Sequence, residues 1–169
     1  MVPRMFRALF VAPAVVLAMG LGGCSMGVRA DASKDIAAFL KAAHQGDRKG
    51  FEAGIDRPAL QSDLRDQIAD LGRNNTLDVD GGPSEFAIDR MISPGAFRLV
   101  EAQTGRALPD APTPAQVQLL MKVADRNHVC VRNPAKNHCV LQFARKKGRW
   151  KLVGMQATDL KIEVVPTKK

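Results

Sequence analysis

The spacing of hydrophobic residues changes once along this chain, near His128, and this change constrains the fold more than any other feature. Before it, hydrophobic residues recur every three or four positions, as on one face of a helix; after it they alternate, as on one face of a strand. Helices and strands segregated along a chain in this way are typical of α+β domains. The sequence therefore predicts several N-terminal helices packed on a C-terminal antiparallel β-meander of three to four strands.

The same pattern and the capping signals place the individual elements. Ser33 is expected to cap the first helix, and Thr113 and Gln116 form a capping box before a later helix. The expected helices cover residues 33–45, 48–55, 58–71, 86–92, 94–104 and 114–124. The expected strands cover residues 129–131, 139–143, 150–153 and 160–165. Because 46% of the residues are hydrophobic, residues 33–169 are expected to form one domain around one core.

Residues 1–23 have the features of a secretory signal peptide. Arg4 and Arg7 form a short positive region, and residues 8–21 then carry no charged side chain. This run has 14 residues, whereas a membrane-spanning helix needs about 20, so a transmembrane anchor is not expected. The sequence therefore predicts export.

The signal ends in Leu21-Gly22-Gly23-Cys24, which resembles the bacterial lipoprotein signal. This resemblance implies cleavage before Cys24, attachment of a lipid to Cys24 and a short tether over residues 24–32. Ser25 then favours a periplasm-facing outer-membrane lipoprotein, because an aspartate at that position is the usual inner-membrane retention signal. The alternative is ordinary cleavage after Ala30, which would discard Cys24 and release a soluble periplasmic protein.

The charge balance is strongly basic. The formal net charge is +8, of which Arg4 and Arg7 contribute two, so the exported part carries +6. Such a charge favours anionic neighbours such as lipid head groups, whereas nucleic acid is not an expected partner of an exported protein. A cluster in the C-terminal part is either a solvated turn or an anionic-surface patch. Its members are Arg145, Lys146, Lys147, Arg149 and Lys151.

Two cysteines lie in the predicted meander. If the hairpin is centred on Pro134 and Ala135, Cys130 faces Cys139 directly across the two strands. In an oxidising compartment such a pair forms a disulfide. The sequence therefore predicts a disulfide between Cys130 and Cys139.

A metal site is the alternative reading of this hairpin. Four residues with zinc-binding side chains occur between positions 128 and 139: His128, Cys130, His138 and Cys139. In the expected register His138 points to the opposite face from the other three, which disfavours a shared metal. Residues 78–82 hint at a calcium loop, but a glycine-rich turn is favoured because later ligands of such a loop are missing. No metal and no cofactor are predicted.

The N-terminal helices carry a family resemblance. Gly46-Asp47 ends one helix, Phe51 lies in a short second helix, and Asp56-Arg57-Pro58-Ala59-Leu60 begins a third. Residues 35–67 thereby resemble a bacterial family known as domain of unknown function 2939, and residues 149–155 resemble its closing strand. The resemblance implies an envelope location in proteobacteria and no known activity. The order of elements is also similar to cystatin-like and NTF2-like folds.

These observations favour a non-catalytic role. The sequence contains no nucleophile elbow, no zinc-protease motif, no P-loop and no dinucleotide fingerprint. The leading hypothesis is a cell-envelope lipoprotein domain that binds a small ligand or another envelope component, or has a structural role. The alternative is a periplasmic enzyme or a redox or metal protein that uses an NTF2-like pocket or the hairpin of His128, Cys130 and Cys139.

Overall fold

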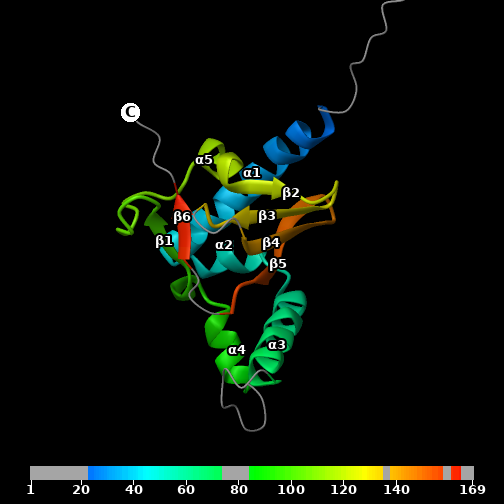
Figure 1. Ribbon diagram of the computed structural model, residues 1–169, viewed down its shortest axis with the longest axis vertical. Helices are drawn as coiled ribbons and strands as arrows, with labels where there is room; N and C mark the ends of the chain where they lie inside the picture. Colours follow the sequence, from blue (N-terminus) through cyan, green and yellow to red (C-terminus); the bar gives the residue numbers. More distant parts are fainter. Residues whose placement is uncertain (1–22, 74–83, 135–137, 158–160, 165–169) are drawn as a thin grey trace, which may run out of the picture.

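The computed structural model describes residues 23–73, 84–134, 138–157 and 161–164 (Figure 1). The helices are α1 (Gly23–Gln45), α2 (Arg48–Ala53), α3 (Arg57–Arg73), α4 (Glu85–Met91), the short 3-10 helix η1 (Pro94–Ala96) and α5 (Pro114–Leu120). The strands are β1 (Arg98–Glu101), β2 (Met121–Val123), β3 (His128–Arg132), β4 (Cys139–Lys146), β5 (Arg149–Met155) and β6 (Lys161–Val164). This order of elements confirms the predicted α+β class.

The main sheet is antiparallel with the strand order β2-β3-β4-β5. Its first strand differs from the sequence prediction: the helix expected over 114–124 ends at Leu120, and Met121–Val123 pair with β3 instead. The capping box of Thr113 and Gln116 is confirmed. Met121 is fully buried, so the extended backbone places this side chain in the core beneath the sheet.

A second, two-stranded sheet joins distant parts of the chain. β1 and β6 run parallel and pair Arg98 with Lys161 through Glu101 with Val164. The helix expected over 94–104 is therefore wrong, because the chain turns only once in η1 and then extends. The strand expected over 160–165 exists as β6, but it pairs with β1 and does not extend the meander.

Helix α1 begins earlier than the sequence suggested. It runs without interruption from Gly23, so residues 24–32 are helical where a tether was expected. Ser33 is not an N-cap: it is buried inside the helix, and its Oγ donates to the Ala30 carbonyl at 3.0 Å. Ala32 is also buried, so the packed part of α1 starts well before the first predicted turn.

An aromatic cluster fixes α1 and α2 against the sheet. The ring of Phe39 lies 5.2 Å from Phe51, 5.3 Å from Phe97 and 5.7 Å from Phe143, measured between ring centroids. Each such pair contributes about 0.5 to 1.5 kcal/mol beyond its buried area. Gly54 completes the cluster because a Cβ atom there would lie 2.9 Å from the Phe39 ring.

The outer edge of β5 is covered by neighbouring elements. The Leu152 N–H donates to the Gly54 carbonyl at 2.9 Å, and the Leu152 carbonyl accepts from the Asp56 N–H at 2.9 Å. Further along, the Met155 N–H donates to Asp63 Oδ2 at 3.0 Å. Gln67 Nε2 donates to the Met155 carbonyl at 2.8 Å. Helix α3 and the turn before it thus supply hydrogen bonds that another strand would otherwise make.

Candidate functional site

The predicted anchor residue lies in α1. Cys24 is followed by continuous helix as far as Gln45, and the first turns of α1 extend beyond the sheet at the top of Figure 1. At a rise of about 1.5 Å per residue, Asp31 lies about 10 Å along the axis from Cys24. The helix therefore joins position 24 to the core without a flexible segment between them.

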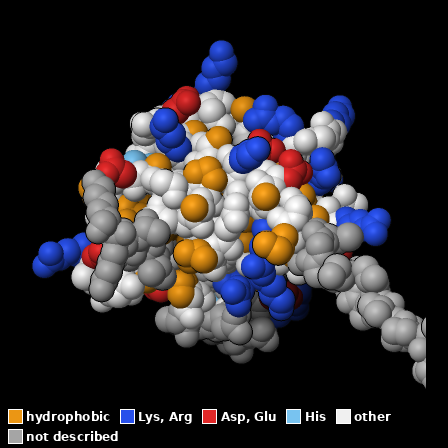
Figure 2. All heavy atoms as spheres, turned by 90° about the horizontal axis from the view of Figure 1, so that it is seen from above, with side chains coloured by type: hydrophobic (Ala, Val, Ile, Leu, Met, Phe, Trp, Pro, Cys, Tyr) orange, Lys and Arg blue, Asp and Glu red, His pale blue; other side chains and the backbone are white. Residues whose placement is uncertain are grey.

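Hydrophobic side chains are exposed near this end. Met26 is 74% exposed, and Leu119 on the neighbouring helix α5 is 65% exposed. The two helices are joined by a hydrogen bond from Gln118 Nε2 to Ser33 Oγ at 3.2 Å. Seen from above, small hydrophobic areas on this face lie among projecting Lys and Arg side chains and several Asp and Glu side chains (Figure 2).

The β4–β5 hairpin is attached to α1 by two carboxylates. Asp31 Oδ2 accepts a hydrogen bond from Trp150 Nε1 at 3.0 Å, and Asp35 Oδ2 accepts one from the Trp150 N–H at 2.9 Å. The two acids are four residues apart and so lie on the same face of the helix. The Trp150 ring is 2% exposed, which makes these hydrogen bonds part of the packing of the hairpin.

The predicted basic cluster divides into paired and unpaired cations. Arg145 pairs with Asp31 at 3.4 Å, Arg149 with Asp35 at 3.6 Å and Lys146 with Asp56 at 3.7 Å. All three cations are about half or more exposed, so each pair contributes about 1 kcal/mol or less. Lys151 is half-buried on β5.

Lys147 of this cluster and two cations outside it are exposed and, within the part of the chain that the structure describes, form no ion pair. They are Arg29 on α1, Arg126 between β2 and β3, and Lys147 at the tip of the β4–β5 hairpin. The turn that carries Arg126 and the hairpin that carries Lys147 are adjacent, because the Arg145 N–H donates to the Asn127 carbonyl at 2.8 Å. We use the name anchor face for five exposed residues from the elements around this end of α1: Met26, Arg29, Leu119, Arg126 and Lys147.

The turn that carries Arg126 also contains a titratable pair. Asp125 accepts hydrogen bonds from the Asn127 N–H at 2.7 Å and from His128 Nδ1 at 2.9 Å. The Asn127 hydrogen bond, followed by the contact with His128, lowers the pKa of Asp125 below its usual value. The carboxylate therefore remains ionised and holds this turn at neutral pH.

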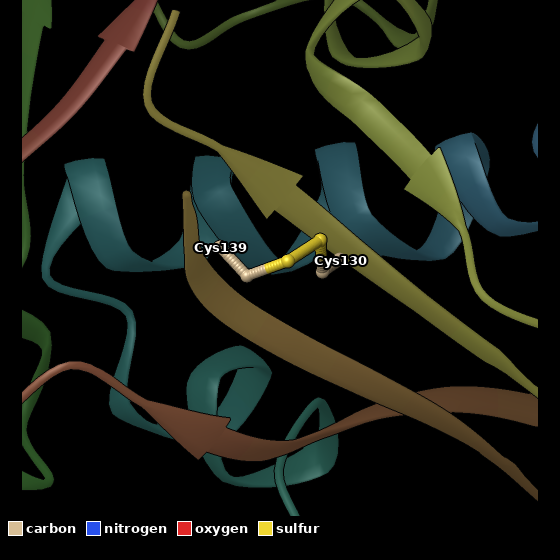
Figure 3. The surroundings of a disulfide bond; sticks show 2 residues. All are labelled: Cys130 and Cys139. Carbon is tan, nitrogen blue, oxygen red and sulfur yellow. A yellow bond between two sulfur atoms is a disulfide. The ribbon is translucent and has the colours of Figure 1, made fainter. Parts of the chain in front are cut away.

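The disulfide between Cys130 and Cys139 is present, as predicted, and joins β3 to β4 (Figure 3). The predicted register is wrong, because Cys130 lies opposite Gln142 and Cys139 lies opposite Arg132. The shift arises at an irregularity in the ladder, where Val131 pairs with Leu141 and the next pair skips Val140. The two Cα atoms are nevertheless 5.6 Å apart, within the usual range for a disulfide.

The two histidines of this hairpin have separate partners. His128 contacts Asp125, whereas His138 Nε2 lies 3.0 Å from Gln156 Oε1. With both cysteine sulfurs joined to each other, the structure does not bring the four candidate zinc ligands together. In the described ranges no group of three or more His, Cys, Asp or Glu could hold a metal ion. The possible calcium loop at 78–82 lies outside the described residues.

Sequence reasoning missed most of the anchor face. It singled out Lys147, but Arg29 and Arg126 are isolated in the sequence and meet only through the fold. Asp31 and Asp35 were also missed as partners of the hairpin. Their four-residue spacing was visible, but their opposite charge to residues 145–151 was the only signal that could have linked the two segments.

Within the described residues, no helix is both long and apolar enough to cross a membrane. Searches among models of known protein families, curated proteins and solved structures find no match. The resemblance to domain of unknown function 2939 thus stays a prediction.

Proposed function

We propose that this chain is an exported cell-envelope lipoprotein domain with a non-catalytic binding or structural role, anchored by a lipid on Cys24. The anchor face then lies against the membrane surface. The observation that carries the proposal is that helix α1 contains the predicted lipidation site, and that exposed hydrophobic and charged side chains, among them Met26 and Arg29, lie on the same part of the helix.

Charge and hydrophobicity of the anchor face fit an anionic membrane. A lysine or arginine close to such a surface contributes about 1 kcal/mol of binding, and the attraction decays over about 10 Å in salt. Arg29, Arg126 and Lys147 are exposed and without ion pairs in the described part of the chain.

Two further observations support export and lipidation. The Cys130–Cys139 disulfide is typical of proteins that fold in an oxidising compartment. Cleavage after Ala30 would remove the first turns of α1, including Val28, which packs against the hydrophobic core. Lipidation at Cys24 would keep those turns.

The first test is the intact mass of the protein isolated from native membranes, with and without reduction and alkylation. We expect a chain that begins at Cys24 and carries lipid, with two thiols that react only after reduction. An unlipidated chain that begins after Ala30 would contradict the anchor, and thiols that react without reduction would contradict the disulfide.

The second test separates the lipid from the protein surface. We expect a Cys24→Ser variant of the mature chain to bind vesicles of phosphatidylglycerol but not of phosphatidylcholine, with binding that weakens as salt is added. Exchanging Arg126 and Lys147 for Glu should lower this binding at least about tenfold. The matched control exchanges Lys49 and Arg106, which are exposed on α2 and on the loop after β1. Equal loss in both double variants would contradict a specific anchor face.

A further inference from the structure

A groove lies between helices α2, α3, α4 and η1, and it is separate from the anchor face. Its volume is about 920 Å³, within the range of sites that bind small organic molecules. In Figure 1 α4 lies at the bottom of the molecule, whereas the start of α1 lies at the top. The residues that carry the argument are Arg48, Glu52, Arg57, Phe86, Asp89 and Arg90.

Arg57 is fixed in the groove by two carboxylates. Its guanidinium contacts Glu52 through both Nε and Nη2, and its Nη1 lies 3.0 Å from Asp89 Oδ1. The hydrogen bond to Glu52 is the main reason that the pKa of Arg57 is raised. Gln61 Nε2 also donates to Asp89 Oδ1 at 3.1 Å. The two acids of the groove are therefore already occupied by partners from α3.

The other two arginines are not paired with acids. Among the described residues, neither Arg48 nor Arg90 forms an ion pair. The Arg90 guanidinium carbon instead lies 5.8 Å from the centroid of the Phe86 ring, on the same helix. The groove therefore offers two cations for an anion, and one of them is already placed beside an aromatic face.

Phe86 gives the groove an apolar component. Its side chain is 70% exposed, and the other exposed large hydrophobic side chains in the described part of the chain are Met26 and Leu119 of the anchor face. An exposed aromatic ring next to an arginine can stack with another ring and leave the guanidinium free to bind an acidic group.

We propose that this groove binds an organic anion that contains an aromatic ring. The acidic group contacts Arg48 and Arg90, and the ring stacks on Phe86. Arg57 holds the side chains of Glu52 and Asp89 in place and does not itself contact the ligand. This site is independent of the lipid anchor, since it lies at the other end of the domain.

The probe for this test is 8-anilinonaphthalene-1-sulfonate, which combines an aromatic system with a sulfonate and changes its fluorescence on binding. The Cys24→Ser form of the mature chain is titrated in detergent-free buffer. We expect Arg90→Gln and Arg48→Gln each to weaken the probe about tenfold, because each loses a charge-assisted hydrogen bond. Phe86→Leu should weaken it as well. Arg106→Gln and Leu119→Ala are the matched controls and should leave it unchanged.

Two further probes separate the two components of the ligand. N-phenyl-1-naphthylamine has the aromatic rings without the acidic group, and inorganic sulfate has the charge without the rings; we expect both to bind more weakly than the combined probe. Equal affinity for the neutral and anionic probes, with no effect of Arg48→Gln and Arg90→Gln, would overturn the proposal. Loss of binding in Leu119→Ala alone would place the probe on the anchor face and would also overturn it. Circular dichroism of each variant confirms that it is folded.

Discussion

Helix α3 presents polar side chains on two faces, and the comparison between them shows how similar residues take different roles. On one face, Asp63 and Gln67 hydrogen-bond to the backbone of β5 and close the edge of the sheet. On the other, Arg57 and Arg65 pair with side chains of α2 and α4 that line or flank the groove. Both faces are half-buried.

The difference lies in the partner groups. Backbone N–H and C=O groups at a sheet edge cannot move, so side chains that bind them become part of the fold. The carboxylates of Glu52, Glu85 and Asp89 are on exposed side chains that can rearrange, so their ion pairs cost little to open. We therefore expect changes on the sheet side to lower stability and changes on the groove side to lower ligand binding.

The largest expected effect is on the sheet itself. Replacing both Cys130 and Cys139 by Ser should lower the free energy of unfolding by about 2 to 3 kcal/mol, because the bond closes a short loop. Affinity for 8-anilinonaphthalene-1-sulfonate should not change. Urea unfolding of the oxidised wild type and the double variant measures the free energy of unfolding, and fluorescence titration measures the affinity for the probe. If the double variant lost affinity for the probe under conditions where it is fully folded, the groove would depend on the sheet.

The next largest effect is at the β5 edge. Asp63→Ala removes the acceptor of the Met155 N–H and one partner of Gln67, so it should cost about 1 to 2 kcal/mol. Ser62→Ala, at an exposed neighbouring position of α3, is the matched control and should change stability by less than about 0.5 kcal/mol. Equal unfolding midpoints for the two variants would contradict the role of Asp63 at the edge.

The groove face should respond in the opposite way. Arg57→Gln should cost less than about 1 kcal/mol of stability, because the Arg57 side chain is 33% exposed and its partners more so. It leaves Glu52 and Asp89 without a cation, so the anionic probe should bind about threefold more weakly, or about 0.7 kcal/mol. A stability loss as large as that of Asp63→Ala would remove the distinction between the two faces.

The smallest effect concerns Asp125, which lies on neither face of α3. Its pKa is lowered mainly by the Asn127 hydrogen bond, so the stabilisation is present above the pKa of the unfolded chain and is lost as the pH falls through the lower, folded value. The unfolding temperature of the wild type should therefore fall slightly more on acidification than that of Asp125→Asn. Identical pH profiles below pH 5 would show that the turn does not depend on this carboxylate.

The sequence was sufficient for features that are encoded locally. The change of period near His128 predicted the fold class, and Thr113 with Gln116 predicted a helix start, because both depend on residues a few positions apart. The disulfide was also predicted, since two cysteines so close in a hairpin have few other arrangements.

Features that depend on distant residues were missed. The pairing of β1 with β6 joins Leu99 to Ile162, and neither segment carries a signal for the other. The skipped residue Val140 shifted the register of the hairpin, and nothing in its sequence marks a bulge. Arg48 of α2 and Arg90 of α4 line the same groove, which only the packing of the helices determines.

The covered edge of β5 also bears on how the protein behaves at high concentration. A sheet can recruit a strand from another molecule only where consecutive backbone groups are open, and such recruitment is a route to aggregation. Along β5, Gly54 and Asp63 accept hydrogen bonds from backbone N–H groups, and Asp56 and Gln67 donate to backbone carbonyls. At the opposite edge, β2 is only three residues long and carries the exposed Lys122. Both edges of the main sheet are thus protected from pairing with a strand of another molecule, so the folded protein should resist this route to aggregation when it is concentrated.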